Sequence, residues 1–174
     1  VKGALFGYEP YVAVHVRRGP EYVLFCHAND LDLHAGQKKR TMYGWNVSLA
    51  SCAPSAEAVA DDVARLTRDV GVSNVFLATD SLYPEAFEDV LANRGVRFAR
   101  YGADDDAALP RELHLPVDML LCDEAAFFLG NLPSTVTANI QHDRDNLGWR
   151  RNHTRFFGLG PRDRAALEAW EHTD

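Results

Sequence analysis

Short apolar runs that end abruptly in polar residues recur along this chain. The first, at residues 11–16, is rich in β-branched and aromatic side chains and gives way to Arg17, Arg18 and Gly19. Runs of this length, continuously apolar and bounded by turn residues, are typical of the buried strands of a parallel sheet. We expect further strands at residues 74–80, 96–101, 127–131 and 156–159.

Segments with helical spacing alternate with these runs. Ser55 is placed to cap a helix whose apolar residues recur at three- and four-residue intervals until Gly71 ends it. The alternation of strands and helices predicts a single α/β domain over residues 1–174, with a parallel sheet covered by helices on both faces. Further helices are predicted at residues 84–93, at 116–125 with Pro116 in the first helical position, at 135–146 and at 161–170.

Residues 21–53 lack a sustained period, so we expect a long polar loop there. A loop of that length is usually functional or fixed by a covalent link. A disulfide between Cys26 and Cys52 is the economical assignment and would fix this loop. Cys26, His27 and His34 invite a metal site, but the second close-spaced ligand pair of structural zinc sites is missing, so we expect no metal.

Composition narrows the possible partners. The formal net charge is −7, which argues against a nucleic acid partner, while 47% hydrophobic residues suffice for a core. No stretch approaches the roughly 18 to 20 apolar residues that span a bilayer. The first residues do not resemble a signal peptide, and because the chain begins without Met we expect it to be processed or cut from a longer protein.

The cysteines and two sequons favour the secretory pathway. Asn46 and Asn152 each begin an Asn-x-Ser/Thr triplet that permits N-glycosylation in that compartment. Cys122 falls inside an apolar helical pattern and is expected to be buried and free. With the Cys26–Cys52 bridge, these features favour the endoplasmic reticulum lumen or a secreted setting.

The polar residues behind the first strand are the main candidates for chemistry. In open α/β sheets, ligands bind outside the carboxyl ends of the strands, where His15, Arg17 and Arg18 are expected. Two guanidinium groups and an imidazole suggest a phosphate or diphosphate ligand, because arginine binds such anions through bidentate charge-assisted hydrogen bonds. From these residues alone, a basic turn that pairs with carboxylates elsewhere fits equally well.

Four further residues, at three places in the chain, carry alternative interpretations. Ser134 and Thr135 lie at a predicted helix N-terminus that can hold a phosphate, although such hydroxyls often only cap the helix. Asp80, at the tip of the second strand, could orient a ribose hydroxyl or an arginine, or cap the next helix. Asp118 is expected in the first turn of a mostly apolar helix, where it could accept hydrogen bonds from the N1–H and N2–H₂ edge of guanine.

Several common motifs are missing from the sequence. No G-x-G-x-x-G follows a strand, no G-x-x-x-x-G-K-[ST] phosphate loop occurs, and there is no G-x-S-x-G nucleophile turn. These omissions argue against the usual dinucleotide-binding, nucleoside-triphosphatase and α/β-hydrolase sites. What remains is an α/β domain that holds a phosphate-containing ligand with arginine and a helix N-terminus.

Five ordered motifs resemble the C-terminal half of GDP-fucose protein O-fucosyltransferases, specifically the type that modifies EGF-like repeats. They occur in the family's order and with similar spacing over most of the chain. The motifs are V-x-V-H-V-R-R-G at 12–19, F-L-A-T-D-S at 76–81, V-D-M-L-L-C at 117–122, F-F-L-G-N-x-x-S-T-x-T at 127–137, and D-R-D at 143–145 followed by R-F-F-G at 155–158.

The resemblance implies a GT-B architecture of two Rossmann-like lobes, of which this chain is the C-terminal, nucleotide-sugar-binding lobe and the N-terminal lobe is absent. His15 and Arg17 are then expected at the nucleotide and diphosphate of GDP-fucose, with Arg18 in a structural role because adjacent side chains of an extended chain point apart. Arg17 is the expected catalytic residue, because a guanidinium can neutralise charge that develops on the β-phosphate as the fucose–oxygen bond breaks.

The resemblance also implies the remaining donor contacts and the reaction. Asp118 and Asp80 are expected to bind the donor, Asp118 as a base or ribose contact, and Ser134, Thr135 and Val136 to lie beside the phosphates. Transfer is expected to invert the anomeric centre of fucose, to use a Ser or Thr hydroxyl of an EGF-like repeat, and to need no metal or other cofactor.

The sequence departs from the family pattern at three positions, of which Thr135 replaces a serine and preserves its hydroxyl. Val136 replaces an aromatic residue and loses its stacking, and Leu132 replaces a cysteine, so that only the Cys26–Cys52 bridge is carried over. Much of the acceptor groove belongs to the absent lobe, so the fragment alone is expected to be inactive. Two other hypotheses stay open: a non-catalytic binding or quality-control module of the same fold, and a fucosyltransferase for a different acceptor.

Overall fold

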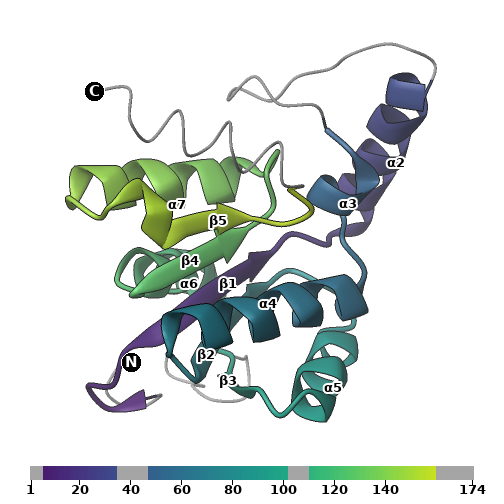
Figure 1. Ribbon diagram of the computed structural model, residues 1–174. Helices are drawn as coiled ribbons and strands as arrows, with labels where there is room; N and C mark the ends of the chain where they lie inside the picture. Colours follow the sequence, from purple (N-terminus) through teal and green to yellow (C-terminus); the bar gives the residue numbers. More distant parts are fainter. Residues whose placement is uncertain (1–5, 35–46, 102–109, 160–174) are drawn as a thin grey trace.

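A five-stranded parallel sheet forms the centre of the described part of the chain. The computed structural model describes residues 6–34, 47–101 and 110–159 (Figure 1). The strand order is β3-β2-β1-β4-β5, so β1 is central and pairs with both β2 and β4. The strands are β1 (Tyr11–Val16), β2 (Asn74–Thr79), β3 (Arg97–Ala99), β4 (Phe127–Gly130) and β5 (Thr154–Phe156).

Helices cover both faces of this sheet, as predicted. Helices α4 and α5 pack on one face, and α6 and α7 pack on the other (Figure 1). The described helices are α2 (Pro20–His34), α3 (Leu49–Cys52), α4 (Ala56–Val70), α5 (Glu85–Asn93), α6 (His114–Asp123) and α7 (Thr135–Asn146), with short 3₁₀ helices η1 (Arg111–Leu113) and η2 (Arg151–His153).

The alternation of side chains along β1 assigns its residues to the two faces. Val12, Val14 and Val16 are fully buried in the core formed with α4 and α5. Tyr11 and Ala13 belong to the core formed with α6 and α7. Because side chains alternate along a strand, the residues that follow at odd positions also face α6 and α7.

Most predicted elements lie where the sequence placed them. The Ser55 hydroxyl caps α4 by accepting a hydrogen bond from the backbone N–H of Ala58 at 3.2 Å, and Gly71 ends α4 in the left-handed conformation with φ +69°. The fifth strand begins at Thr154 rather than at residue 156. None of the described helices has the length and apolar character needed to cross a membrane.

The prediction of a long loop at residues 21–53 is wrong, because helix α2 occupies the first part of this segment. The helix escapes pattern analysis because apolar and polar residues are mixed around it, and Leu24 and Phe25 are 70% and 48% exposed. The disulfide prediction is confirmed: Cys26 in α2 and Cys52 at the end of α3 are bonded, with 5.6 Å between their Cα atoms. Cys122 is buried and free, as predicted.

The start of α6 also differs from the prediction. The helix begins at His114, so Pro116 is its third residue rather than its first, and Asp118 lies in the second turn. Proline is tolerated there because the first backbone N–H groups of a helix have no carbonyl partner within it. Leu115 is 50% exposed, which explains why the apolar pattern does not mark this turn.

Several predictions fall on positions that the structure does not describe or leaves without a test. Asn46 and the helix predicted at 161–170 lie outside the described residues. Asn152 is exposed in η2, which is compatible with its prediction as a glycosylation site. Leu132 is buried against Phe156.

Candidate functional site

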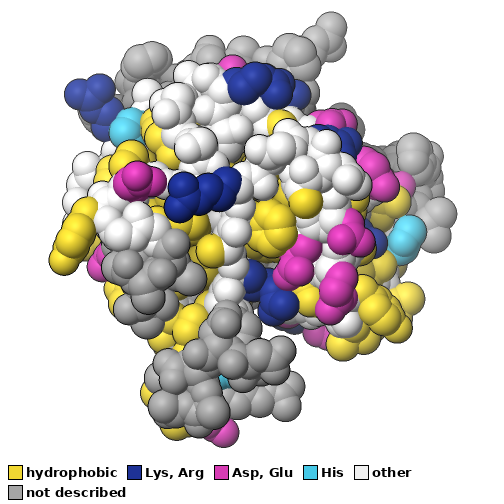
Figure 2. Space-filling view, turned by 90° about the horizontal axis from the view of Figure 1, so that it is seen from below, with side chains coloured by type: hydrophobic (Ala, Val, Ile, Leu, Met, Phe, Trp, Pro, Cys, Tyr) yellow, Lys and Arg dark blue, Asp and Glu magenta, His cyan; other side chains and the backbone are white. Residues whose placement is uncertain are grey.

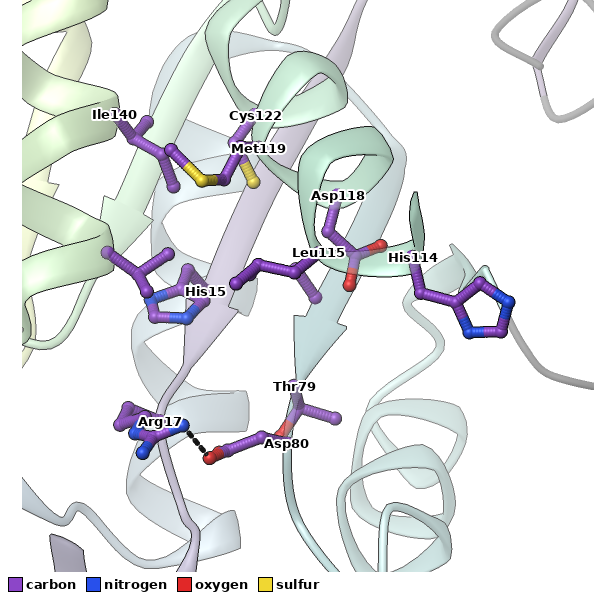
Figure 3. Close-up of a pocket in the computed structure, with 12 residues that line it drawn as sticks. His15, Arg17, Thr79, Asp80, His114, Leu115, Asp118, Met119, Cys122 and Ile140 are labelled. Atoms are coloured by element: carbon purple, nitrogen blue, oxygen red, sulfur yellow. Dashed lines mark hydrogen bonds and ion pairs between the residues drawn. The ribbon is translucent and has the colours of Figure 1, made fainter. Parts of the chain in front are cut away.

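A cavity of about 330 Å³ opens at the carboxyl ends of β1 and β2, between these strand ends and helices α6 and α7. Figure 3 shows His15 and Arg17 on one side and α6 on the other, with Ile140 of α7 above them. Of the predicted donor-binding residues, this cavity brings together His15, Arg17, Asp80, Asp118 and Val136. They come from four segments that are far apart in sequence: the end of β1, the end of β2, helix α6 and the first turn of α7.

His15 is the first of the polar residues at the carboxyl end of β1, and it is buried. Its side chain is 5% exposed, and its Nδ1 atom lies 2.8 Å from the Thr137 hydroxyl of α7. Burial, together with the nearby charge of Arg17, lowers the pKa of His15 to about 4. The imidazole is therefore neutral at physiological pH.

Arg17 lies two residues further, on the same side of the chain as His15. Its Nη1 atom forms an ion pair with Asp80, and its Nη2 atom donates to Glu21 at 2.9 Å. The side chain is 32% exposed. Its backbone N–H donates to the buried Asn131 side chain at 2.7 Å, which fixes the chain as it leaves the strand. Arg17 thus pairs with carboxylates, as one of the two interpretations of this turn predicted, and it also lines the cavity.

Arg18 points away from the cavity, as predicted. Its Nη1 atom donates to the backbone carbonyls of Ala53 and Pro54, at 3.2 and 2.8 Å. These bonds tie the end of β1 to the segment after α3. Arg18 therefore has a structural role.

Asp80 holds the turn after β1 in addition to pairing with Arg17. Its Oδ1 atom accepts hydrogen bonds from the backbone N–H groups of Arg18 and Gly19, at 2.5 and 3.1 Å. A side chain at position 19 would place a Cβ 2.8 Å from Asp80, so glycine allows this close approach. The alternative that Asp80 caps the next helix is wrong, because α5 begins at Glu85 and has no side-chain cap.

Asp118 projects from α6 at the cavity wall (Figure 3). Its Oδ1 atom is buried and has no hydrogen-bond partner among the described residues. Burial raises the pKa of Asp118 to about 7, against the opposing effect of Arg100. A buried polar atom without a partner costs free energy, so the carboxyl is available for a ligand that supplies hydrogen-bond donors.

The N-terminus of α7 divides the three residues predicted beside the phosphates. Ser134 is buried, and its hydroxyl caps α7 by accepting from the Thr137 backbone N–H at 3.4 Å. Thr135 is exposed and does not line the cavity, whereas Val136 does. Val136, in the first turn of α7, is thus the one of the three that lines the cavity, and Ser134 has the capping role that the sequence left open.

Sequence reasoning missed two residues that hold the predicted ones. Glu21 pairs with Arg17 four residues away, a spacing that would have been visible had α2 been predicted. Thr137 contacts His15 across 122 residues, and its place three residues after the capping Ser134 was the available signal. The cavity wall also includes Ala78, Thr79, Met119 and Cys122, which the motifs carried without an assigned role. His114, Leu115 and Ile140 line it as well and lie outside the motifs.

The charge distribution is mixed outside this cavity. On the face that Figure 2 shows, the described basic side chains lie apart, with acidic and apolar side chains between them. In the part of the chain that the structure describes, no group of three or more His, Cys, Asp or Glu side chains is arranged to hold a metal ion.

The fold and the cavity define a class: a Rossmann-like α/β lobe that offers an arginine, a neutral histidine and a helix N-terminus to an anionic ligand. The family can then be stated. The model of the GDP-fucose protein O-fucosyltransferase family matches residues 3–147, and the chain belongs to this family. The family resemblance drawn from the sequence motifs is confirmed.

Two relatives illustrate this membership. The chain is 22% identical over 163 residues to GDP-fucose protein O-fucosyltransferase 1 of Caenorhabditis elegans, a match that covers 87% of this chain and 38% of the relative. It is 34% identical over 106 residues to GDP-fucose protein O-fucosyltransferase 2 of Drosophila melanogaster, covering 58% of this chain and 21% of the relative.

Solved structures confirm the fold. A crystal structure of POFUT1 in complex with GDP-fucose aligns with a TM-score of 0.67 at 20% identity, over 87% of this chain and 42% of that one. A structure of POFUT1 in complex with GDP aligns with a TM-score of 0.64 at 20% identity, over 86% of this chain and 43% of that one. The chain thus spans less than half the length of the proteins it matches.

Proposed function

We propose that this chain is the GDP-fucose-binding lobe of a protein O-fucosyltransferase, which transfers fucose from GDP-fucose to a serine or threonine of an EGF-like repeat with inversion at the anomeric carbon. The observation that carries the proposal is the cavity at the strand ends, where Arg17, His15 and Asp118 converge. Family membership and the fold shared with a protein crystallised with GDP-fucose support it.

The donor contacts follow from the polarity of the cavity. Its volume of about 330 Å³ falls within the range of small-molecule sites. Asp118 has an unpartnered carboxylate oxygen, which suits the N1–H and N2–H₂ donors of guanine. Arg17 would bind the diphosphate, because a guanidinium has five N–H donors and its two carboxylate partners leave some of them for phosphate oxygens.

Arg17 would also carry the catalytic role. As the bond between fucose and the β-phosphate oxygen breaks, negative charge builds up on the diphosphate, and a fixed guanidinium stabilises it. Asp80 and Glu21 hold this guanidinium in place before the donor binds. In this proposal the arginine and the N-terminus of α7 supply the positive charge, and the transfer uses no metal or further cofactor.

The acceptor and the compartment belong to the whole protein. A second lobe, which the GT-B architecture implies, would supply much of the groove for an EGF-like repeat. The Cys26–Cys52 disulfide supports an oxidising compartment such as the lumen of the endoplasmic reticulum. The partners proposed are therefore GDP-fucose and an EGF-like repeat protein.

A second candidate function differs only in the acceptor. The identity to the Drosophila O-fucosyltransferase 2 is 34%, against 22% to the C. elegans O-fucosyltransferase 1, although over a shorter match. A transfer assay with folded EGF-like repeats and with a panel of other extracellular repeats separates the two candidates. Transfer to the other repeats alone would replace the EGF-like acceptor and keep the donor.

Calorimetry of the full-length protein with GDP, GDP-fucose and UDP tests the donor proposal. We expect saturable binding of both guanine nucleotides and much weaker binding of UDP, whose base lacks the adjacent pair of donors for Asp118. Absence of GDP binding at millimolar concentration would contradict the proposal. Equal binding of UDP would show that Asp118 does not recognise the guanine base.

A further inference from the structure

The hydrogen bond between His15 and Thr137 has two possible directions, which correspond to the two neutral tautomers of the His15 imidazole. Nδ1 of His15 and the Thr137 hydroxyl oxygen are 2.8 Å apart, and either atom can be the donor. If the hydroxyl donates to Nδ1, the proton of the neutral ring is on Nε2. If Nδ1 donates, Nε2 carries a lone pair instead. The two tautomers present opposite hydrogen-bonding properties to a ligand.

We propose that Thr137 is a positioning residue for His15: its hydroxyl donates to Nδ1 and thereby places the ring proton on Nε2, the nitrogen left for a ligand in the cavity. The assignment of the resulting N–H to the donor diphosphate rests on the proposed function. Phosphate oxygens are hydrogen-bond acceptors, so they bind an Nε2–H and are repelled by an Nε2 lone pair.

The surroundings of the Thr137 hydroxyl favour this direction of donation. The Thr137 side chain is fully buried. Among the described residues, the hydrogen-bond partner of its hydroxyl is Nδ1 of His15. A hydroxyl that only accepted from Nδ1–H would leave its own hydrogen unpaired in the interior, which costs free energy. Donation to Nδ1 satisfies both groups with one bond.

The backbone around Thr137 places its side chain beside the His15 ring. Gly130 of β4 is the residue paired with His15 of β1. A Cβ at position 130 would lie 2.7 Å from Cγ2 and 2.8 Å from Oγ1 of Thr137, so the glycine makes room for the threonine beside the imidazole. Ser134 fixes the first turn of α7 by accepting the backbone N–H of Thr137. Three residues of the motif at 127–137 thus serve the orientation of one histidine.

The ring also stays singly protonated, which a tautomer preference requires. Burial and the charge of Arg17 hold the pKa of His15 near 4, well below neutral pH. Arg17 lines the same cavity, so an anion bound there meets both the guanidinium and the Nε2–H. The preset N–H needs no proton uptake when the donor binds.

The tautomer can be read directly by ¹⁵N NMR of the histidine rings in the full-length protein without ligand. The His15→Gln variant assigns the His15 signal by its loss. We expect a neutral ring with the proton on Nε2 at pH 7. A proton on Nδ1, or on both nitrogens, would overturn the proposal.

Variants at position 137 test the consequence for binding. Thr137→Val keeps the shape and removes the hydroxyl, and we expect about tenfold weaker GDP binding, as for loss of one hydrogen bond, and a mixture of tautomers. Thr137→Ser keeps the donor and is expected to restore both the Nε2–H signal and most of the affinity. Thr67→Val is the matched control, because the Thr67 hydroxyl donates to the carbonyl of Ala64 within α4, away from the cavity.

A double-mutant cycle separates positioning from general structural damage. In a His15→Ala background, Thr137→Val is expected to cause no further loss of GDP affinity, since Thr137 acts through the imidazole. An equal loss in both backgrounds would overturn the proposal. A wild-type protein that shows Nε2–H but binds no GDP would refute the proposed function and leave the tautomer assignment standing.

Discussion

The two faces of the sheet are both covered by helices, but they bury different kinds of side chain. Against α4 and α5, the described core is apolar throughout, and no buried polar residue of the described chain belongs to either helix. Against α6 and α7, apolar residues share the interior with His15, Thr137, Asp123 and Arg144. One face is a core, whereas the other combines a core with the candidate binding site.

The polar residues of the second face are held by specific partners. Arg144 is fully buried, and its Nη1 atom donates to the carbonyls of Cys122, Asp123 and Ala125, at 3.0, 3.0 and 2.7 Å. It thus caps the C-terminal end of α6, the helix that carries Asp118, from within α7. Burial of a charge is tolerated there because the unpaired carbonyls of a helix end accept its hydrogen bonds.

The largest effect is expected from damage to the apolar face. Phe87→Ala in α5 removes a buried ring and should lower the free energy of unfolding by about 3–5 kcal/mol. GDP affinity of the folded variant should stay within about twofold, because the ring lies on the opposite face from the cavity. Chemical denaturation and calorimetry measure the two quantities.

The exposed aromatic Tyr83, which precedes the same helix, provides the stability control. Tyr83→Ala should change the free energy of unfolding by no more than about 0.5 kcal/mol, because its side chain is 73% exposed. A tenfold loss of GDP affinity in folded Phe87→Ala would contradict the separation of core and site.

The next effect concerns the polar tip of β1. Arg17→Ala should slow fucose transfer by about 10²–10³-fold, the usual cost of removing one group that stabilises developing charge. A transfer assay with a folded EGF-like repeat measures it. Arg97→Ala, on the edge strand β3 and exposed, should leave the rate unchanged. Equal and negligible transfer by the wild type and Arg17→Ala would favour the non-catalytic module.

Asp118 is expected to give pH effects of opposite sign on stability and binding. Its pKa is raised from 3.8 to about 7 in the folded protein, so its contribution to stability is full below pH 4 and lost as the pH rises through 7. GDP affinity should increase over that rise, because guanine donors bind the ionised carboxylate. Asp118→Asn should lose the part of each dependence that Asp118 contributes, so its profiles should diverge from those of the wild type when measured by denaturation and calorimetry between pH 5 and 8. Burial also raises the pKa of Asp123 to about 6, and that contribution stays the same in both proteins. A wild-type profile that matches Asp118→Asn would contradict the burial of this carboxyl.

The smallest effect is expected from filling the apolar wall of the cavity. Val136→Phe restores the aromatic residue of the family pattern and should tighten GDP binding about two- to tenfold through stacking, worth about 0.5–1.5 kcal/mol. Val136→Leu adds apolar volume without a ring and is the control for volume alone. Equal gains in both variants would show that stacking is not involved.

The sequence predicted the features that depend on neighbouring residues. The apolar runs located the strands, Ser55 and Gly71 marked the ends of α4, and the alternation along β1 placed Arg17 with His15 and Arg18 apart from them. The ordered motifs identified the family, and five of the predicted donor-binding residues line one cavity. The strands, the caps and the alternation could be predicted because periodicity, capping and side-chain alternation act over a few residues, whereas the donor-binding residues came from the family motifs.

The tertiary structure decided the features that depend on burial and on contacts distant in sequence. The helix α2 is held by packing and a disulfide rather than by an amphipathic pattern, so periodicity did not find it. The bond of His15 to Thr137, the pairing of Arg17 with Asp80 and the raised pKa of Asp118 all require the folded chain. Residue type sets which chemistry is possible, whereas only the fold sets which atoms meet and how far water is excluded from them.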